Sequence, residues 1–123
     1  MPFFSIVIPL YNKANFILAT LKSVSDQTFE NYEIIIINDG STDDSLSKIE
    51  ALKLPKLSIH TQENKGLSAA RNRGVTLARG QYVALLDADD LWKPTYLESM
   101  FNLIENYPNH QIFGCSYKES RNG

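Results

Sequence analysis

The sequence predicts an α/β protein with a mostly parallel β-sheet and helices on its flanks. Short apolar runs rich in β-branched residues alternate along the chain with stretches that carry apolar residues at helical spacing. One run contains four consecutive isoleucines, residues 34–37, which is typical of a strand buried on both faces. Strands separated by helices are joined by right-handed crossovers, which bring parallel strands side by side.

The first two strands and the helix between them are predicted from composition and spacing. Phe3 to Pro9 is rich in β-branched and aromatic residues and ends at a proline, which cannot donate to a strand ladder. Phe16 to Val24 carries apolar residues at helical spacing. Tyr32 to Ile37 contains the isoleucine run, which is broken by the polar stretch Asn38–Ser41.

The next helix and strand have recognisable ends. Ser41 and Asp44, three residues apart, resemble a helix-capping arrangement. The helix that follows has its apolar positions at Leu46, Ile49 and Leu52, and Pro55 stops it. Leu57 to His60 then alternates in polarity and is predicted as a short strand.

The second half of the chain repeats the alternation. Gly66 to Ala78 is predicted as a helix whose small inward residues permit close packing, and Gln81 to Leu86 as a buried strand. Pro94, a favourable first helical residue, opens a further helix, and Gln111 to Tyr117 is predicted as a last strand. The inward positions of the two helices are Leu67, Ala70, Gly74 and Val75 in the first, and Leu97, Met100, Phe101 and Ile104 in the second.

Length and composition indicate a single domain over residues 1–123. A chain of 123 residues with 43% hydrophobic content can bury about two-thirds of its unfolded surface in one core. The net charge of −2 gives no basic surface field, which argues against a nucleic-acid polymer as a partner. The lone cysteine, Cys115, allows no internal disulfide and is expected to be a small core residue.

The sequence carries no sign of export or of membrane crossing. Its first residues lack a basic segment, and Pro9 and Asn12 interrupt the apolar run that follows. No stretch approaches the length of a transmembrane helix. Together with the single cysteine, these features predict a cytoplasmic protein. Attachment at the inner face of a membrane would need a segment outside this chain.

Three acids, Asp87, Asp89 and Asp90, follow the apolar run that ends at Leu86. Asp87 and Asp89 are two positions apart, so in an extended segment both carboxylates point to one side. Carboxylates there are costly unless a cation or hydrogen-bond donors satisfy them, and hard oxygen ligands suit Mg²⁺ or Mn²⁺. The simpler interpretation is an acidic turn that caps the next helix, with Asp90 as a helix-start residue.

Polar clusters follow three of the predicted strands. They are Pro9–Asn12 after the first strand, Asn38–Ser41 after the second and Asp87–Asp90 after the fourth. Ligands of open α/β sheets bind beyond the carboxyl ends of the strands, so we expect these clusters to form one site. A protein without a ligand would also place turn residues there. It would not need acids at two strand ends and an aromatic residue at a third.

Familiar phosphate-binding signatures are missing from the sequence. There is no G-x-G-x-x-G after the first strand and no G-x-x-x-x-G-K-[ST]. A phosphate group would therefore be held by a metal ion, helped by the cations Lys65 and Arg71. Both cations could instead be ordinary surface residues. Arg71 lies between small residues that are predicted to pack, which favours a role in the site.

Five stretches of the chain carry a family resemblance: Ile6–Asn12, Gln27–Phe29, Asn38–Asp43, Asn64–Asn72 and Leu86–Asp90. Taken in order, they resemble the family 2 glycosyltransferases of the GT-A fold, a Rossmann-like fold, and the match extends over nearly the whole chain. The resemblance implies an inverting transfer of a sugar from a nucleotide diphosphate donor, usually UDP-linked, with Mg²⁺ or Mn²⁺. The acceptor would be a saccharide or a lipid-linked molecule, such as a growing cell-surface polysaccharide.

The resemblance also implies roles for individual residues. The nucleotide would contact Pro9, Tyr11, Asn12, Asp39, Gly66, Arg71, Asp87 and Ala88, and the metal would be held by Asp89, its principal ligand, and Asp87. The chemistry of two residues agrees with these roles. The Tyr11 ring offers a flat face on which a base can stack. Asp39 can accept the N3–H of uracil, a donor that cytosine lacks.

The chain departs from the family pattern at two points. Asn38 stands where the family usually has the first of two aspartates. The family's general base lies in an acceptor-binding half further along, so the catalytic base is unknown here and is expected beyond Gly123. We therefore expect a donor-binding GT-A domain that is truncated at its C-terminus. Two alternatives remain open: a nucleotide-sugar-binding module without turnover of its own, and a purely structural α/β domain.

Overall fold

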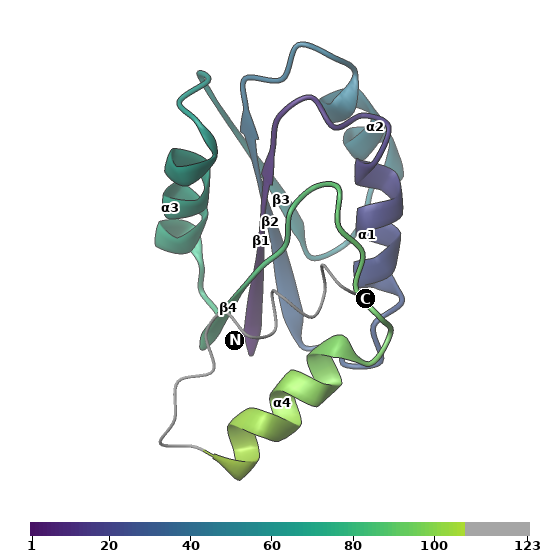
Figure 1. Ribbon diagram of the computed structural model, residues 1–123, viewed down its shortest axis with the longest axis vertical. Coiled ribbons are helices and arrows are strands. Elements are labelled where there is room, and N and C mark those ends of the chain that lie inside the picture. The colour runs from purple at the N-terminus through teal and green to yellow at the C-terminus, as the bar shows by residue number, and fades with distance from the viewer. Residues whose placement is uncertain (108–123) are drawn as a thin grey trace.

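The computed structural model describes residues 1–107. Within these residues the chain alternates four strands with four helices (Figure 1). The strands are β1 (Phe4–Leu10), β2 (Tyr32–Asp39), β3 (Leu57–Gln62) and β4 (Tyr82–Leu85). The helices are α1 (Ile17–Ser25), α2 (Ser45–Leu52), α3 (Leu67–Leu77) and α4 (Tyr96–Asn106).

The described strands form one sheet in the order β3-β2-β1-β4, and every pair is parallel. The chain builds outward from β1 through β2 to β3, and then crosses back to place β4 on the other side of β1. This reversal creates a switch point between β1 and β4, the kind of place where open α/β sheets bind ligands. The prediction of a mostly parallel α/β sheet with flanking helices is confirmed.

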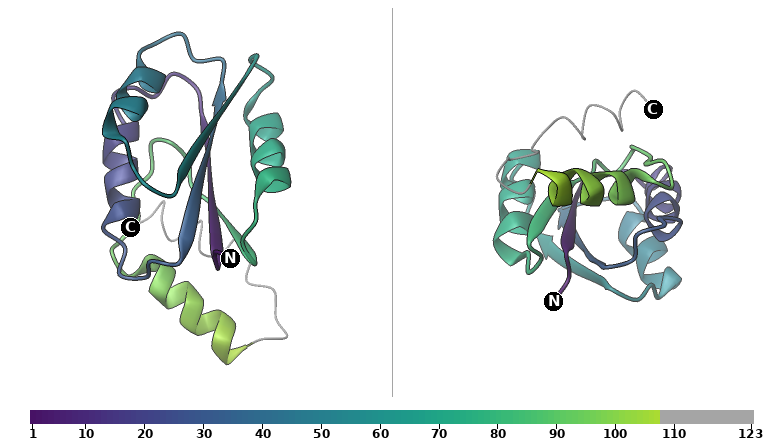
Figure 2. Two further views of the ribbon diagram at one scale, coloured as in Figure 1. Left: turned by 180° about the vertical axis from the view of Figure 1, so that it is seen from behind. Right: turned by 90° about the horizontal axis from the view of Figure 1, so that it is seen from below.

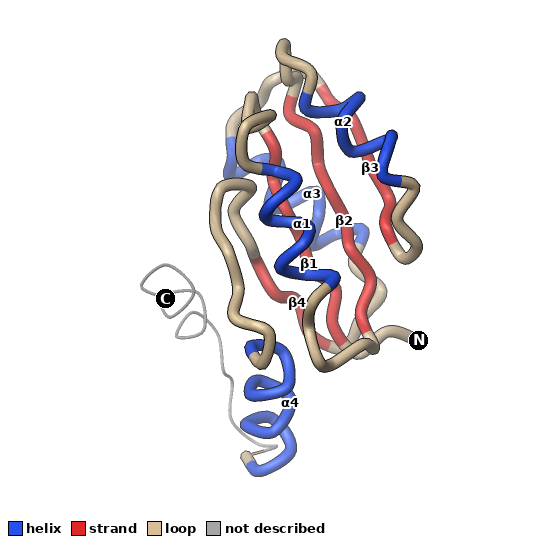
Figure 3. Tube along the Cα trace, turned by 90° about the vertical axis from the view of Figure 1, so that its right-hand side faces the viewer, coloured by secondary structure: helices blue, strands red, loops and turns tan. Residues whose placement is uncertain are grey.

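Helices cover both faces of the sheet. α1 and α2 lie on one face and α3 lies on the other (Figure 1; Figure 2), and Figure 3 shows α1 and α2 in front of the strands. α4 lies at the end of the sheet where the strands begin (Figure 1). At that end Phe101 packs against Phe29 with ring centroids 4.9 Å apart, which fixes α4 to the body of the domain.

The alternation of strand side chains divides the core into two layers. Ile34 and Ile36 face the larger layer, which includes the apolar residues of α1 and α4. Ile35 and Ile37 pack with Ala70 of α3 in the smaller layer. Because neighbouring strand residues point to opposite faces, the isoleucine run fills both layers. Full burial of one such side chain stabilises the fold by roughly 1.5–3 kcal/mol.

The inward face of α3 is narrower than the sequence suggests. Ala70 and Gly74 are buried as predicted, but Leu67 and Val75 are each 46% exposed, so the prediction that they point inward is wrong. The physical reason is the close approach of α3 to the sheet. A Cβ atom added at Gly74 would clash with the Val7 side chain, so only small residues fit on this face.

Two of the predicted helix starts are also wrong. Ser41 does not cap α2, which begins at Ser45, because the Ser41 hydroxyl instead accepts the backbone N–H of Asn12. Pro94 and Asp90 both lie upstream of α4, so neither is a helix-start residue. The segment between Asp90 and α4 is held by hydrogen bonds to Ser23 of α1 and to Gln27, which follows α1, before the chain coils into a helix.

Three remaining points concern the second half of the chain. β4, predicted as a buried strand, is only partly buried, because among the described strands it pairs on one side alone, with β1. The predicted strand Gln111–Tyr117 and the core placement of Cys115 lie outside the described residues. None of the helices within residues 1–107 combines the length and the apolar character that spanning a membrane requires.

Candidate functional site

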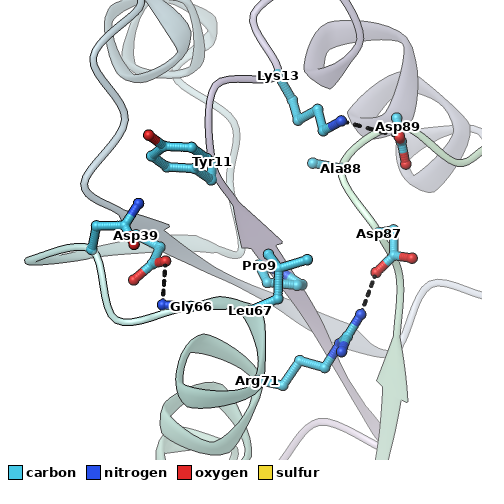
Figure 4. Close-up of a pocket in the computed structure, with 11 residues that line it drawn as sticks. Pro9, Tyr11, Lys13, Asp39, Gly66, Leu67, Arg71, Asp87, Ala88 and Asp89 are labelled. Carbon is cyan, nitrogen blue, oxygen red and sulfur yellow. Dashed lines mark hydrogen bonds and ion pairs between the residues drawn. The ribbon is translucent and has the colours of Figure 1, made fainter.

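A cavity of about 500 Å³ opens at the switch point between the carboxyl ends of β1 and β4 (Figure 4). Of the residues that the family resemblance assigned to the nucleotide or the metal, every one lines this cavity except Asn12. Lys13, Asn64 and Leu67 line it as well. The three polar clusters predicted from separate parts of the sequence therefore meet around a single space.

Asn12 shapes the cavity from outside it. Its backbone has a positive φ of 50°, a conformation that asparagine tolerates better than most residues. Its side-chain oxygen accepts the backbone N–H groups of Thr42 at 2.7 Å and Asp43 at 3.2 Å. These bonds clamp the loop after β1 to the loop after β2. The residues on either side of Asn12, which are Tyr11 and Lys13, consequently face the cavity (Figure 4).

Asp39, the last residue of β2, is 1% exposed and accepts three hydrogen bonds. Gln62 Nε2 and the Lys65 backbone N–H donate to Oδ1, both at 2.8 Å, and the Gly66 N–H donates to Oδ2 at 2.9 Å. Burial alone would raise the pKa of Asp39, but these hydrogen bonds outweigh it and hold the pKa below its ordinary value. Asp39 thus remains charged while it fixes the loop that leads into α3.

Gly66 is the turning point of that loop. Its φ of 98° lies in the region that glycine adopts without strain, and α3 begins at the next residue. The Lys65 side chain is exposed and does not line the cavity, so this residue contributes to the site through its backbone N–H and its charge. Of the two cations considered from the sequence, Arg71 is the one whose side chain lines the cavity.

Arg71 and Asp87 form an ion pair across the cavity wall (Figure 4). Arg71 Nη2 lies 3.1 Å from Asp87 Oδ1, and the side chains are 32% and 16% exposed. Arg71 comes from α3, where it follows the small residue Ala70 that packs against the sheet. The pair therefore places one fixed positive charge beside the first carboxylate of the acidic cluster.

Asp89 is the more open carboxylate of the cluster. The Lys13 Nζ atom lies 3.4 Å from Asp89 Oδ2, and the two side chains are 41% and 42% exposed. One carboxylate oxygen from each of Asp87, Asp89 and Asp90 can be chosen so that all three lie within 4.8 Å of one another. Hard oxygen donors at this separation, beside a solvent-accessible cavity, fit a Mg²⁺ or Mn²⁺ ion that keeps positions open for further oxygens.

The acidic segment is anchored to α1 by two hydrogen bonds that the sequence analysis missed. The buried Thr20 hydroxyl donates to the Ala88 carbonyl at 2.9 Å. The Trp92 backbone N–H donates to Ser23 Oγ at 3.2 Å. Polar residues at the spacing of Thr20 and Ser23 on an otherwise apolar helix face were the available signal. Lys13 was also missed, although it directly follows a residue assigned to the site.

A comparison with protein families agrees with this geometry. The model for glycosyl transferase family 2 matches residues 5–123 of the chain. The chain belongs to this family. The family resemblance carried by the five sequence stretches is therefore confirmed.

The curated relatives of this family 2 chain are longer proteins. YibD, an uncharacterized glycosyltransferase of Escherichia coli K12, is 45% identical over 101 residues, which make up 80% of this chain and 29% of YibD. Across eight curated relatives, the chain spans between 16% and 38% of the relative's length.

Solved structures of glycosyltransferases share the fold. S. aureus TarS 1-349 in complex with UDP-GlcNAc superposes with a TM-score of 0.82 at 27% identity, over 88% of this chain and 32% of TarS 1-349. The mannosyltransferase PcManGT from Pyrobaculum calidifontis, in complex with GDP-Man and Mn²⁺, gives a TM-score of 0.77 at 26% identity, over 84% of this chain and 32% of PcManGT. The GT-A fold expected from the sequence is confirmed.

Proposed function

We propose that this chain is the donor-binding part of a family 2 glycosyltransferase and that it takes a UDP-linked sugar together with Mg²⁺ or Mn²⁺. The observation that carries the proposal is the meeting of two groups of residues in one cavity. On one side lie Tyr11, which can stack on a base, and Asp39, which can accept a hydrogen bond from one. The carboxylates Asp87 and Asp89 lie on the other side. A nucleoside and a metal-bound diphosphate need these two chemistries at opposite ends of one site.

The nucleoside end follows from the residues around Asp39. Tyr11 is 38% exposed and lines the cavity, so a base in the cavity could stack on its ring. Asp39 Oδ2 accepts one hydrogen bond from the chain and, like any carboxylate oxygen, has the capacity to accept a second. The N3–H of uracil could supply it. TarS was solved with UDP-GlcNAc and PcManGT with GDP-Man, so base choice is a testable property of this chain.

The diphosphate end follows from the acidic segment. Asp89 would be the principal ligand of the divalent cation, with Asp87 beside it and held by Arg71. The bound cation would neutralise diphosphate oxygens and the charge that develops on the leaving group. PcManGT was solved with Mn²⁺, which supports the metal part of the proposal.

The transfer step needs more than the donor cavity. We expect transfer with inversion to a saccharide or lipid-linked acceptor, with a general base that is positioned opposite the departing diphosphate. The chain spans at most 38% of the length of the eight curated relatives, so the acceptor and the base belong to the proposal for the whole protein. The alternative is a donor-binding module without turnover, which would retain the same cavity.

The proposal is tested by calorimetry with UDP, once with Mn²⁺ and once with a chelator. We expect clearly tighter binding with Mn²⁺, and we expect Asp89→Asn to remove the metal-dependent part. Asp89 is half-exposed, so this substitution should change the free energy of unfolding by less than about 1 kcal/mol. Asp26→Asn is the matched control, because Asp26 forms an exposed ion pair with Lys22 on α1 and does not line the cavity.

Two results would contradict the proposal. Equal UDP affinity with Mn²⁺ and with a chelator would remove the metal role from Asp87 and Asp89. Absence of UDP binding under both conditions would favour a purely structural domain.

A further inference from the structure

Lys13 occupies a position that the donor-binding proposal does not explain. Its ammonium lies 3.4 Å from Asp89 Oδ2, the carboxylate that would hold the divalent cation. Both side chains are about two-fifths exposed, at 41% and 42%. An ion pair this open to solvent contributes little net free energy and can exchange its partners readily. Two cations, a lysine and a metal ion, therefore have the same carboxylate within reach.

The backbone of Lys13 is fixed by hydrogen bonds, whereas its side chain has only solvent-exposed contacts. The carbonyl of Lys13 accepts the backbone N–H groups of Phe16 and Ile17, both at 2.9 Å, at the start of α1. On its N-terminal side, Asn12 is clamped to the loop after β2. The four-carbon side chain thus projects into the cavity from a fixed point (Figure 4). Its ammonium also lies 5.8 Å from the centroid of the Phe16 ring, a second weak contact.

The second ion pair in the cavity is built differently. Arg71 lies 3.1 Å from Asp87, and the two side chains are 32% and 16% exposed, so this pair is shorter and better shielded from water. Shielding strengthens an ion pair and makes its exchange more costly. Of the two cationic side chains within residues 1–107 that line the cavity, Lys13 is the one that can leave its carboxylate at low cost.

We propose that Lys13 is an exchangeable counter-ion of the metal site. Lys13 and a divalent cation compete for Asp89, and the displaced Lys13 ammonium then binds an oxygen of the donor diphosphate. This second step rests on the proposed function, whereas the competition at Asp89 does not. Lys13 would therefore oppose binding of the metal alone and favour binding of the metal together with the diphosphate.

The physical basis is the repulsion between like charges at short range. An ammonium beside Asp89 raises the free energy of a divalent cation at the same carboxylate, and removing that ammonium should strengthen metal binding. When a diphosphate is present, Lys13 favours binding, because the diphosphate oxygens accept charge-assisted hydrogen bonds from the displaced ammonium. Metal and diphosphate then bind cooperatively, and the coupling is reciprocal by thermodynamic linkage.

The test measures two affinities for each of four proteins: the unaltered chain, Lys13→Met, Lys13→Arg and Lys22→Met. Mn²⁺ is first titrated alone and free Mn²⁺ is measured by electron paramagnetic resonance. UDP is then titrated by calorimetry at saturating Mn²⁺. Lys22→Met removes the same charge from an exposed pair with Asp26 that does not line the cavity. Circular dichroism confirms that each variant is folded.

We expect Lys13→Met to move the two affinities in opposite directions. Affinity for Mn²⁺ alone should rise by roughly three- to tenfold, because a competing positive charge is gone. Affinity for UDP at saturating Mn²⁺ should fall by about tenfold, because a charge-assisted hydrogen bond is lost. Lys22→Met should change neither by more than about twofold. Lys13→Arg should resemble the unaltered chain in both titrations.

Opposite shifts exclude a merely structural role for Lys13, since a damaged site would weaken both ligands. If Lys13→Met binds Mn²⁺ no more tightly than the unaltered chain, the competition is overturned, even where UDP binding upholds the proposed function. If only the UDP affinity is unchanged, the phosphate step is overturned. If the unaltered chain binds no UDP, the proposed function fails together with the phosphate step, and the Mn²⁺ titration alone decides the competition.

Discussion

The two ends of the β-sheet use carboxylates in opposite ways. At the end where the strands begin, Glu33 of β2 is buried, and besides the exposed Arg79 guanidinium it accepts hydrogen bonds from the Ser5 hydroxyl and the Arg79 backbone N–H. At the carboxyl end, Asp87 and Asp89 are paired with the tips of long cationic side chains. All three carboxylates have a cationic partner, and the additional hydroxyl and backbone donors of Glu33 are what mark it as a carboxylate that holds the fold.

The Glu33 network joins three parts of the domain. Glu33 accepts hydrogen bonds from the Ser5 hydroxyl of β1, and from the backbone N–H and the guanidinium of Arg79, at 2.8 and 3.1 Å. The Gly80 N–H donates to Ser5 Oγ at 2.7 Å. A Cβ at Gly80 would lie only 2.8 Å from the Ser5 backbone nitrogen, so the connection from α3 to β4 passes very close to β1. The Glu33 network thus ties β1, β2 and the connection from α3 to β4 together at this end of the sheet.

Asp39 is intermediate between the two kinds of carboxylate. It accepts two backbone N–H groups, as a structural carboxylate would, yet it lines the cavity at the carboxyl end of the sheet. Its role at the site can therefore be to fix the loop before α3, to contact a base, or both. Substitutions and a change of pH separate these possibilities. Lowering the pH acts on several structural carboxylates at once, because it protonates them together.

The largest expected effect is that of acid. The pKa values of Glu33, Asp39 and Asp43 are lowered, because their hydrogen bonds outweigh the effect of burial, which would raise them. In the window between these lowered values and the ordinary value of about 4, the unfolded chain binds more protons than the folded chain. The stability that these groups contribute is therefore present above about pH 4.5, and it is lost as the pH falls through the lowered pKa values.

Urea unfolding at a series of pH values checks this expectation. The midpoint should stay nearly constant from pH 7 to about pH 5 and then fall steadily toward pH 3. A midpoint that does not move over this range would show that the hydrogen-bonded carboxylates contribute no proton-linked stability. The role of Glu33 in stabilising the fold would then lose its support.

Glu33→Ala should have the next largest effect. It leaves the Ser5 hydroxyl and the Arg79 backbone N–H without their acceptor, which should lower the free energy of unfolding by about 2–4 kcal/mol. Glu50→Ala, on the exposed side of α2, should change it by less than about 0.5 kcal/mol. Urea unfolding measures both. The UDP affinity of folded Glu33→Ala should be unchanged, because Glu33 lies at the opposite end of the sheet from the cavity. A selective loss of UDP binding would contradict the distinction between structural and ligand-accessible carboxylates.

The strands and most of the site could be predicted from the sequence because their signals are local. Four isoleucines in a row indicate a strand buried on both faces, and Asp87 with Asp89 indicates an oxygen-rich site at a strand end. The parallel arrangement then brings the clusters together. The inward face of α3 was predicted too broadly, because the spacing of Leu67 and Val75 does not reveal how closely Gly74 approaches the sheet.

The contacts that shape the site could not be predicted, because they join residues far apart in the sequence. Asn12 holds the backbone of Thr42, thirty positions away, and Thr20 holds the carbonyl of Ala88, sixty-eight positions away. Neither pair shows a local pattern. The assignment of Asn12 to nucleotide contact rested on family resemblance, whereas its side chain bonds to the neighbouring loop and does not line the cavity.

The smallest expected effect is that of Asp39→Ala on the preference for UDP over CDP. This substitution tests whether Asp39 contacts the base or only fixes the loop before α3. If Asp39 accepts the N3–H of uracil, the unaltered chain should prefer UDP to CDP by roughly 1–3 kcal/mol, and Asp39→Ala should flatten that preference. The ratio of the two affinities, measured by calorimetry at saturating Mn²⁺, is the informative quantity. Loosening of the loop before α3 should weaken both nucleotides alike and cancel in the ratio.

Asp43→Ala is the matched control for this ratio. Asp43 also accepts backbone N–H groups, from Ala14 and Ser45, and so holds loops beside the site, but it does not line the cavity. Asp43→Ala should therefore preserve the preference for UDP even where it lowers both affinities. If the unaltered chain binds CDP as well as UDP, Asp39 does not read the base. It would then belong with Glu33, as a carboxylate that holds the fold, and the ligand-accessible acids of this sheet end would be Asp87 and Asp89.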